Sequence, residues 1–335
     1  MKKVLVLGSS GAMGQYLVPY LSEMGYAVDA VSLDDEDISY KNVNTIKANV
    51  FGKGVLDSLL ENHYDGVVDF MNYNADSFYY YYKKFLCNTD HYIFLSSCRV
   101  YANEETPVRE TSPRLLDVTK DPLLRASDDY CIYKAKSENL LMYSGYKNWT
   151  IVRPATTFSK MRYQLVTLEA PFNVGRAFSG RKKVVLPIQA KEKPATLNWA
   201  GDVSKMLARL IFNPSAICEA FNVCSSESRK WGEIADYYTD ICGLEPVWVD
   251  KEDYLKILNP EVPNGLRWQL EYARLFDRIT DNSKVLKVCD MKQESLVPLY
   301  DGLKREIAAC PKDYKWWGEE VNARMDEYLK EHKYI

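Results

Sequence analysis

Short apolar segments alternate with longer amphipathic segments through the first half of the chain. Five apolar, β-branched segments predict buried strands: 2–8, 27–33, 65–71, 91–97 and 149–155. Four segments with a helical pattern lie between them: 13–25, 54–63, 76–88 and 129–144. Strand–helix alternation with apolar strands is typical of a parallel sheet that helices cover on both faces. The pattern therefore predicts an α/β fold with a doubly wound parallel Rossmann sheet.

The alternation of strand and helix patterns ends after residue 158. The last third of the chain is rich in Trp, Tyr and charged residues, and its patterns are mostly helical. A helical pattern at 200–213 and a short apolar segment at 219–225 suggest a return to the sheet. We therefore expect one domain from residues 1–158 plus about 196–227. Two remaining segments are expected to form a smaller, mostly helical lobe: about 159–195 and 228–335.

Charge and hydropathy exclude some classes of partner. The 335 residues carry a net charge of −3, which gives no basic footprint for nucleic acid or an anionic membrane. No stretch approaches the roughly 18–20 apolar residues of a membrane span. The apolar run after Lys2 and Lys3 is also too short for a signal peptide. We expect a cytoplasmic protein that contacts neither membrane nor nucleic acid.

The cysteines and histidines give no metal or disulfide pattern. None of the eight cysteines has Cys-x-x-Cys spacing, so reduced and mostly buried thiols are expected. The only histidines, His63, His91 and His332, are far apart in sequence. We expect no metal site and no histidine-based catalytic triad.

A glycine-rich segment, "VLVLGSSGAMG", joins the first predicted strand to the first predicted helix. Its glycines have the spacing G-x-x-G-x-x-G. Glycine permits positive φ and close backbone approach, and the helix N-terminus attracts an anion. The segment therefore predicts a site for the pyrophosphate of a dinucleotide. Six residues are expected to contact it: Gly8, Ser10, Gly11, Ala12, Met13 and Gly14.

The end of the second predicted strand bears on which dinucleotide binds. Ser32 stands there, and Asp34 and Asp35 follow closely. A carboxylate at this place would bind the ribose 2′-hydroxyl of NAD, whereas an arginine would suit the phosphate of NADP. No Arg or Lys occurs between Ser32 and Lys41. The acids favour NAD without excluding NADP, and a solvated acidic loop is the alternative interpretation.

The pattern Tyr-x-x-x-Lys occurs five times, starting at Tyr79, Tyr80, Tyr130, Tyr143 and Tyr300. Position separates one from the rest. Two serines end the fourth strand in "SSCRVYA" (96–102), and the helix that begins near Tyr130 follows them. Ligands bind at the carboxyl ends of strands in such sheets. Tyr130 is therefore the candidate for chemistry, and an ordinary amphipathic helix surface is the alternative.

Six motifs in order resemble the extended short-chain dehydrogenase/reductases, the NAD-dependent epimerase/dehydratase family, over about residues 1–245. They are the glycine motif at 8–14, "SSCRVYA" at 96–102, "YCIYK" at 130–134, "VRPAT" at 152–156, "AGDVSKML" at 200–207 and "AFNVCS" at 220–225. "HYIFLSSCRVY" and "RLFDRITDNSK" (274–284) further resemble a branch that includes chloroplast stem-loop binding proteins.

The resemblance implies roles for three catalytic residues. Ser97 would hydrogen-bond the reacting oxygen. Tyr130 would take the proton of a substrate hydroxyl while nicotinamide C4 takes the hydride. A free tyrosine has a pKa of about 10, and the Lys134 ammonium on the same helix face would favour its phenolate.

By the same resemblance, Pro154 would lie beside the cofactor. Where the family carries alanines beside the cofactor, this chain has "FMNYN" (70–74), so that Asn72 or Tyr73 would touch the cofactor or narrow the pocket. The second lobe would bind the substrate.

The chain departs from the family pattern where substrate binds. Thr156 stands where nucleotide-sugar epimerases carry an Asn for the diphosphate, and Ala195 where an Arg clamps it. Cys98 and Arg99 follow Ser97 in place of the Asp-Glu pair of 4,6-dehydratases, which favours epimerisation or oxidoreduction over dehydration. Candidate substrate contacts are Arg99, Thr156, Arg274 and Arg278. A structural ion pair is the alternative for Arg99, and a solvated helix face for Arg274 and Arg278.

Three functions remain open at this point. The leading hypothesis is an NAD-dependent epimerase that acts on a nucleotide sugar or related sugar by transient hydride abstraction and return. An NAD(P)H-dependent carbonyl reductase or alcohol dehydrogenase is the alternative enzyme. An RNA-binding or regulatory protein on a Rossmann scaffold is the alternative of another class. The resemblance also implies a homodimer, for which the aromatic helix 76–88 is the candidate surface.

Overall fold

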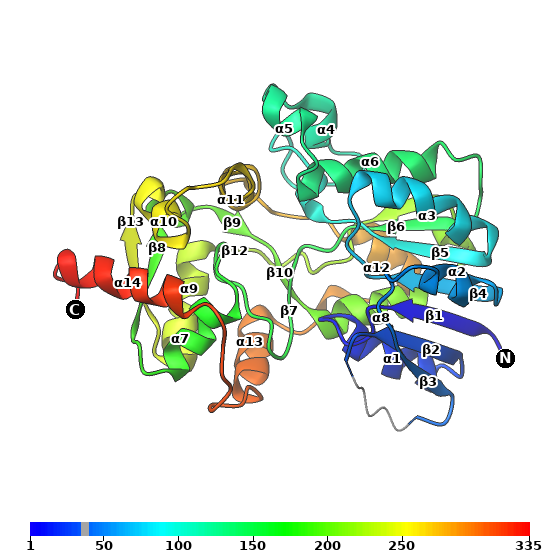
Figure 1. Cartoon of the computed structure of the whole chain (residues 1–335), viewed down its shortest axis with the longest axis horizontal. Coiled ribbons are helices and arrows are strands. Elements are labelled where there is room, and N and C mark those ends of the chain that lie inside the picture. Colours follow the sequence, from blue (N-terminus) through cyan, green and yellow to red (C-terminus); the bar gives the residue numbers. More distant parts are fainter. Residues whose placement is uncertain (35–39) are drawn as a thin grey trace. The chain divides into compact units, whose positions relative to one another are not determined.

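The computed structural model describes residues 1–34 and 40–335 (Figure 1). The chain divides into two compact units. The first unit comprises Met1–Ala155, Ala200–Ser225 and Asp281–Leu296, and the second comprises Thr156–Trp199, Ser226–Thr280 and Val297–Ile335. Residues 281–296 differ from the expected division, which placed them in the helical lobe. They join the first unit because helix α12 (Ser283–Cys289) packs against helix α8 (Ala200–Leu210).

The first unit is built on one seven-stranded sheet in which all neighbours are parallel. The strand order is β11-β6-β5-β4-β1-β2-β3. The strands are β1 (Lys3–Leu7), β2 (Ala27–Ser32), β3 (Val43–Lys47), β4 (Tyr64–Asp69), β5 (Thr89–Leu95), β6 (Trp149–Val152) and β11 (Glu219–Phe221). The order reverses direction at β1, so the predicted doubly wound Rossmann sheet is confirmed.

Helices cover both faces of this sheet (Figure 1). Helix α1 (Gly14–Glu23) and α8 share a buried core with strand residues such as Val4 and Val6. The other face is covered by α2 (Val55–Leu60), α3 (Ala75–Cys87) and α6 (Tyr130–Met142). Double coverage explains why the central strands are almost continuously apolar.

The segment between β5 and α6 contains only short helices. A 3₁₀ turn, η1 (Cys98–Val100), follows β5 directly and packs against α6. Helices α4 (Leu115–Val118) and α5 (Pro122–Ala126) come next, and the Asp121 side chain caps α5. The 3₁₀ turns η4 (Pro214–Ala216) and η6 (Gln293–Ser295) complete the first unit.

The second unit is mostly helical, with three two-stranded pairs. The pairs are β7 (Thr156–Phe158) with β10 (Leu197–Trp199), β8 (Lys183–Pro187) with β13 (Glu245–Val249), and β9 (Pro194–Ala195) with β12 (Arg229–Lys230). The helices are η2 (Ala170–Phe172), α7 (Val174–Phe178), η3 (Ile188–Ala190), α9 (Trp231–Cys242), α10 (Lys251–Leu258), α11 (Asn264–Gln269), the π-helix η5 (Leu270–Arg274), α13 (Leu299–Ala308) and α14 (Glu319–Glu331).

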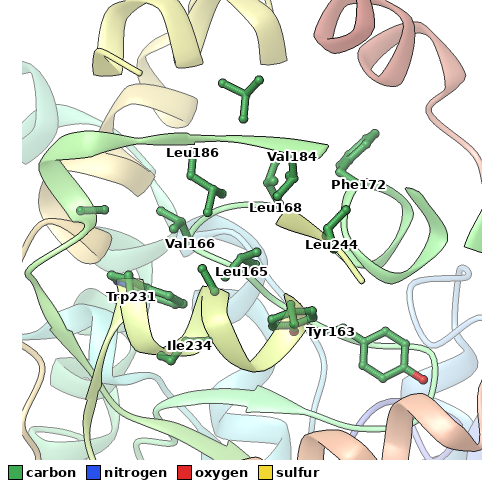
Figure 2. Close-up of a cluster of buried hydrophobic side chains, with 14 of the residues drawn as sticks. Tyr163, Leu165, Val166, Leu168, Phe172, Val184, Leu186, Trp231, Ile234 and Leu244 are labelled. Carbon is green, nitrogen blue, oxygen red and sulfur yellow. The ribbon is translucent and has the colours of Figure 1, made fainter. Parts of the chain in front are cut away.

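An apolar core of its own stabilises the second unit. Figure 2 shows Trp231 and Ile234 from α9 packed below Val184 and Leu186 of β8. The Trp231 indole N–H donates to the Arg274 carbonyl, 3.2 Å away, so the buried ring has no unsatisfied polar atom. Packing is therefore the role of Trp231.

Buried His91 gives the first unit a predictable response to acid. Its Nδ1 accepts from the Phe212 amide (2.9 Å), and its Nε2 lies 2.8 Å from the hydroxyl of Thr150. The Thr150 hydroxyl donates to the Ala216 carbonyl, so it must accept from the imidazole. If His91 bound a second proton, that proton would lie on Nδ1 and face the N–H of Phe212. Burial lowers the pKa of His91 from 6.5 to about 4.

The free energy of unfolding should therefore fall by up to about 3 kcal/mol between pH 6.5 and pH 4, because only the unfolded state then binds this proton. Urea unfolding of the wild type and His91→Gln at pH 7 and pH 4.5 measures the effect. His91→Gln should remove most of this pH dependence, whatever the substitution does to stability at pH 7. An equal fall in the free energy of unfolding from pH 7 to pH 4.5 in both proteins would contradict this role of His91.

Candidate active site

The glycine loop between β1 and α1 is shaped by its lack of side chains. Gly8 has φ +83°, and its amide and that of Ser9 both donate to the Val31 carbonyl (2.8 and 3.0 Å). A Cβ on Gly14 would lie 2.3 Å from the Ser9 carbonyl oxygen and 2.6 Å from that of Gly8. The first turn of α1 can therefore lie against the loop only with glycine at position 14.

These residues fit the pyrophosphate of a dinucleotide. Gly11 is exposed, and α1 starts at Gly14, so the positive end of the helix dipole lies at the loop. The hydroxyl of Ser204 on α8 donates to the Met13 carbonyl (2.8 Å) and ties the loop to the neighbouring helix. Six residues form the candidate cradle: Gly8, Ser10, Gly11, Ala12, Met13 and Gly14.

Gly14→Ala should weaken NAD binding at least about tenfold, because the added methyl group forces the loop away from the helix. Isothermal titration of the cofactor-free protein with NAD measures the effect. Gly25→Ala is the control for a general loss of stability: alanine is strained at its φ of +82°, but a Cβ there meets nothing within 4 Å and Gly25 lies beyond the far end of α1. Equal NAD affinity in Gly14→Ala and the wild type would contradict this use of the loop.

The end of β2 carries the two residues expected near the ribose. Ser32 is buried, and its hydroxyl donates to the Asp34 carbonyl (2.9 Å). Asp34 itself is exposed. Asp35, the other acid considered for this place, lies outside the described residues. The Ser32 hydroxyl thus stabilises the turn after β2.

Two serines follow β5, and the structure gives them different partners. The Ser96 hydroxyl donates to buried Glu138 (2.6 Å). The Ser97 hydroxyl accepts from the Arg99 amide (3.2 Å), which leaves its own proton to donate to a ligand. The Cys98 amide donates to the carbonyl of Pro154 (3.0 Å), which joins this turn to the segment after β6. Of the two serines, Ser97 is the one suited to ligand contact.

Tyr130 is the first residue of α6, and Asp129 caps the helix by accepting from the Cys131 amide (3.1 Å). Lys134, one turn later, is only 1% exposed. Its Nζ donates to the Leu95 carbonyl (2.6 Å) and lies 5.6 Å from the centroid of the Tyr130 ring. The lysine is thus anchored to the end of β5 beside the tyrosine, as the four-residue spacing predicts.

Arg99 brings a second cation to Tyr130. Its guanidinium carbon lies 5.1 Å from the Tyr130 ring centroid. One guanidinium nitrogen pairs with Asp129 (3.2 Å), whereas the buried Nε atom has no hydrogen-bond partner among the described residues. The structural ion pair considered for Arg99 therefore exists. The guanidinium also contributes positive charge beside Tyr130.

Burial controls the ionisation of Lys134. Removal from water lowers the pKa of its ammonium group to about 7, although the negative charges of Asp69 and Glu138 oppose the fall. Burial likewise raises the pKa of Asp69 to about 6, against hydrogen bonds from Tyr92 and the Met71 amide. Burial thus favours the neutral amine of Lys134, and the two carboxylates favour the ammonium.

Asn72 and Pro154 lie at the same edge of the sheet. Asn72 follows β4, is exposed, and accepts a hydrogen bond from the Tyr133 hydroxyl (2.5 Å). The Tyr133 ring is buried and meets the Tyr130 ring edge-on at 5.8 Å. Tyr133 is thus a packing neighbour that holds both Asn72 and Tyr130.

The other predicted substrate residues belong to the second unit. Thr156 opens β7, and the Arg274 side chain donates to the Val166 carbonyl (2.7 Å) and to Gln164 (3.0 Å). Arg274 and Arg278 do not share a helix, as their spacing predicted, because η5 ends at Arg274 and Arg278 lies outside any helix or strand. Both arginines are buried, so the solvated helix face is also wrong.

Sequence reasoning missed two buried carboxylates near Lys134. Glu138 receives Arg153 at 2.7 Å and Arg114 at 3.1 Å. Asp69 accepts from the Tyr92 hydroxyl at 2.7 Å. The sequence contains an indication of each. Glu138 lies four residues after Lys134, and Asp69 is an acidic residue at the end of an apolar strand segment.

Comparison with known proteins identifies the family. The model of the NAD dependent epimerase/dehydratase family matches residues 4–223. The chain belongs to the NAD-dependent epimerase/dehydratase family. No curated protein sequence matches it. In the described part of the chain, no helix is both long and apolar enough to cross a membrane.

Solved structures with this fold include several epimerases. An epimerase from Methanothermobacter thermautotrophicus is 17% identical, with a TM-score of 0.69 over 92% of this chain and 91% of that one. The UDP-N-acetylglucosamine 4-epimerase of Methanobrevibacter ruminantium is 16% identical (TM-score 0.66, 91% and 96% covered). The UDP-glucuronic acid 4-epimerase of Bacillus cereus, solved with NAD, is 14% identical (TM-score 0.66, 91% and 98% covered). At these identities the likeness establishes the fold.

Proposed function

We propose that this family member is an NAD-dependent epimerase that acts on a nucleotide sugar. The observation that carries the proposal is the cluster at the end of β5, where the buried Lys134 ammonium and the Arg99 guanidinium both lie within 5.6 Å of the Tyr130 ring. Ser97 lies in the same turn as Arg99. A tyrosine flanked by cations beside a hydroxyl donor suits proton transfer to and from a sugar hydroxyl.

The residues of the chain divide this work as follows. Tyr130, as phenolate, accepts the proton of the reacting hydroxyl and later returns it. Lys134 and Arg99 stabilise the phenolate, and Ser97 donates a hydrogen bond to the substrate oxygen as it becomes a carbonyl. The glycine loop would hold NAD, which when bound supplies the hydride acceptor and donor. Because the pKa of Lys134 is about 7, the support from its charge diminishes above neutral pH.

The substrate class is proposed from the family and from the ligands of its structural neighbours. Neighbouring structures contain UDP-N-acetylmuramic acid, UDP-glucose and a UDP-glucuronic acid analogue. The chain lacks two diphosphate contacts that the family resemblance implies, since Thr156 and buried Ala195 stand at those positions. We therefore propose a nucleotide sugar whose diphosphate is held by residues other than these two.

The experiment has two readouts. Denatured protein should release about one NAD per chain, because an enzyme that returns its hydride retains its cofactor. Incubation with UDP-glucose, UDP-N-acetylglucosamine and UDP-glucuronic acid should give an epimer of at least one, detected by ¹H NMR. Protein that binds NAD but produces no epimer from a broad nucleotide-sugar panel would contradict the proposed substrate class.

A carbonyl reductase is the second candidate, favoured by the apolar, buried side chain of Ala195. A reductase has no need to grip a diphosphate and consumes soluble NADH or NADPH. Loss of absorbance at 340 nm with a simple ketone or aldehyde, together with little retained cofactor, would support this function over the epimerase.

We also propose a homodimer formed through α3. Tyr79 and Tyr80 on this helix are 66% and 58% exposed, which is unusual for aromatic side chains next to each other. Light scattering should give twice the chain mass of 38.6 kDa, and Tyr79→Ser with Tyr80→Ser should reduce it to one chain. A monomeric wild type would contradict the proposal.

The free state of all eight cysteines fits a reducing, cytoplasmic location.

A further inference from the structure

Asp69 is a buried carboxylate to which the mechanism above gives no part. It ends β4 and is 1% exposed. Its Oδ2 accepts from the Tyr92 hydroxyl (2.7 Å), and its Oδ1 accepts from the Met71 amide (2.9 Å). Neutral groups thus supply its hydrogen bonds, and no ion pair with Asp69 occurs in residues 1–34 and 40–335 at salt-bridge distance. A buried charge with only neutral partners is costly unless a cation lies near.

The Lys134 ammonium and the Asp69 carboxylate lie at neighbouring strand ends, beyond salt-bridge distance. In the β4–β5 register Asp69 is directly opposite Phe94. The Lys134 ammonium lies 4.9 Å from the centroid of the Phe94 ring and donates to the carbonyl of Leu95, the next residue. Both charges are thus sequestered at the ends of two adjacent strands. Each affects the other electrostatically.

The other titratable groups that face Lys134 come from α6. The rings of Tyr130 and Tyr133 lie 5.6 and 5.0 Å from its Nζ and carry no charge while protonated. Glu138 is negative, but it is already paired with two guanidinium groups, those of Arg153 and Arg114. Arg99 lies over the Tyr130 ring, and its charge is not among the influences on Lys134. Both carboxylates favour the Lys134 ammonium, Asp69 more strongly than Glu138, and Asp69 is the one with no arginine at salt-bridge distance among the described residues.

We propose that Asp69 is a positioning residue for Tyr130, because its carboxylate keeps the buried Lys134 in the ammonium form that stabilises the phenolate. The catalytic consequence rests on the function proposed above, whereas the coupling of the two charges does not. Without the Asp69 carboxylate, only the charge of Glu138 would oppose the effect of burial on Lys134, and the lysine would lose its proton at lower pH.

Asp69→Asn tests the coupling, and Asp29→Asn is its matched control. Asp29 is a buried carboxylate on β2 that accepts from the Tyr64 hydroxyl at 2.7 Å, the same distance as in the Tyr92–Asp69 bond. Its charge does not contribute to the pKa of Lys134. Unlike Asp69, Asp29 also has a cation partner, Lys3 at 2.8 Å, so Asp29→Asn breaks that ion pair as well. Both substitutions remove a buried carboxylate that a tyrosine hydroxyl bonds, and only Asp69→Asn removes a charge that acts on Lys134.

The measurement is an NMR titration of protein labelled with ¹³C at the lysine Cε, with Lys134 assigned through Lys134→Arg. In the wild type the Lys134 resonance should titrate with a midpoint near 7. The midpoint should fall by at least about one unit in Asp69→Asn, since a nearby opposite charge shifts a pKa by about 1–3 units. Asp29→Asn should leave it unchanged. An unchanged midpoint in Asp69→Asn, or equal shifts in both variants, would overturn the proposal.

The wild type alone provides a second readout if Asp69→Asn does not fold. The same resonance should show a smaller inflection near pH 6, as Asp69 takes up its proton. A single inflection from pH 4 to pH 9 would overturn the coupling. In an active preparation, the alkaline limb of the kcat profile should move to lower pH by the same amount in Asp69→Asn. If the NMR shift occurs but Tyr130→Phe remains active, the proposed function fails while the coupling stands.

Discussion

Tyr130→Phe is expected to lower kcat at least about 100-fold, with KM for the nucleotide sugar within about threefold of the wild type. The phenylalanine ring preserves the edge-on contact with Tyr133 and the Arg99 contact, so binding and folding should survive. Only the hydroxyl that exchanges a proton with the substrate is lost. Steady-state kinetics on the substrate found in the UDP-sugar panel measures both constants.

Tyr143→Phe is the matched control for this substitution. Tyr143 starts another Tyr-x-x-x-Lys sequence, but it is 84% exposed and lies just beyond the last residue of α6. Its activity should equal that of the wild type. Full turnover by Tyr130→Phe, or equal losses in both variants, would show that the proton passes through another group.

Glu138→Gln is expected to lower the free energy of unfolding by about 3–5 kcal/mol at pH 7. Burial alone would raise the pKa of Glu138, but Arg153, Ser96 and Arg114 together hold it below its ordinary value. The amide has nearly the same shape but no charge, so it leaves the buried Arg153 guanidinium without a carboxylate. The remaining partners of Arg153, the Tyr101 hydroxyl and the Glu110 carbonyl, are neutral.

Urea unfolding followed by circular dichroism measures this loss, and Glu219→Gln is its control. Glu219 pairs with Lys284 at 2.7 Å, but both side chains are at least one-third exposed, so that substitution should cost less than about 1 kcal/mol. The extra stability from Glu138 should diminish as pH falls below about 4.5, because the unfolded carboxyl group then binds its proton first. Equal losses in the two variants at pH 7 would contradict this role for the buried pair.

The buried strands of the first unit were predictable because both faces of the sheet are covered. Strands β1 and β6 are apolar almost throughout and lie within their predicted segments. Strands β4 and β5 overlap theirs but begin one and two residues earlier, at Tyr64 and Thr89. The edge strand β3 escaped prediction, because its five residues are partly or fully exposed and carry little apolar signal. That α12 belongs to the first unit was also not predicted, because its place depends on packing against α8, about 80 residues earlier in the chain.

The part of the candidate site that depends on residues close together in the sequence was predictable. The start of α6 and the four-residue spacing place Lys134 on the Tyr130 face of the helix. The burial of Lys134 and its approach to Asp69 were not predictable, because they require β4 and β5 to be neighbours. For Arg278 the local pattern was misleading. Its spacing from Arg274 suggested one helix, but the π-helix ends at Arg274, four residues earlier.

The proposed chemistry is tested most directly by following one deuterium atom through turnover. UDP-glucose deuterated at C4, and the other UDP sugars labelled in the same way, are incubated with the protein in ordinary water and followed by ¹H NMR. Because the hydride leaves and returns to one carbon while Tyr130 exchanges only the hydroxyl proton, the epimer should keep its deuterium at C4. An epimer that has lost the deuterium to water, or no epimer from any sugar of the panel, would contradict the proposal.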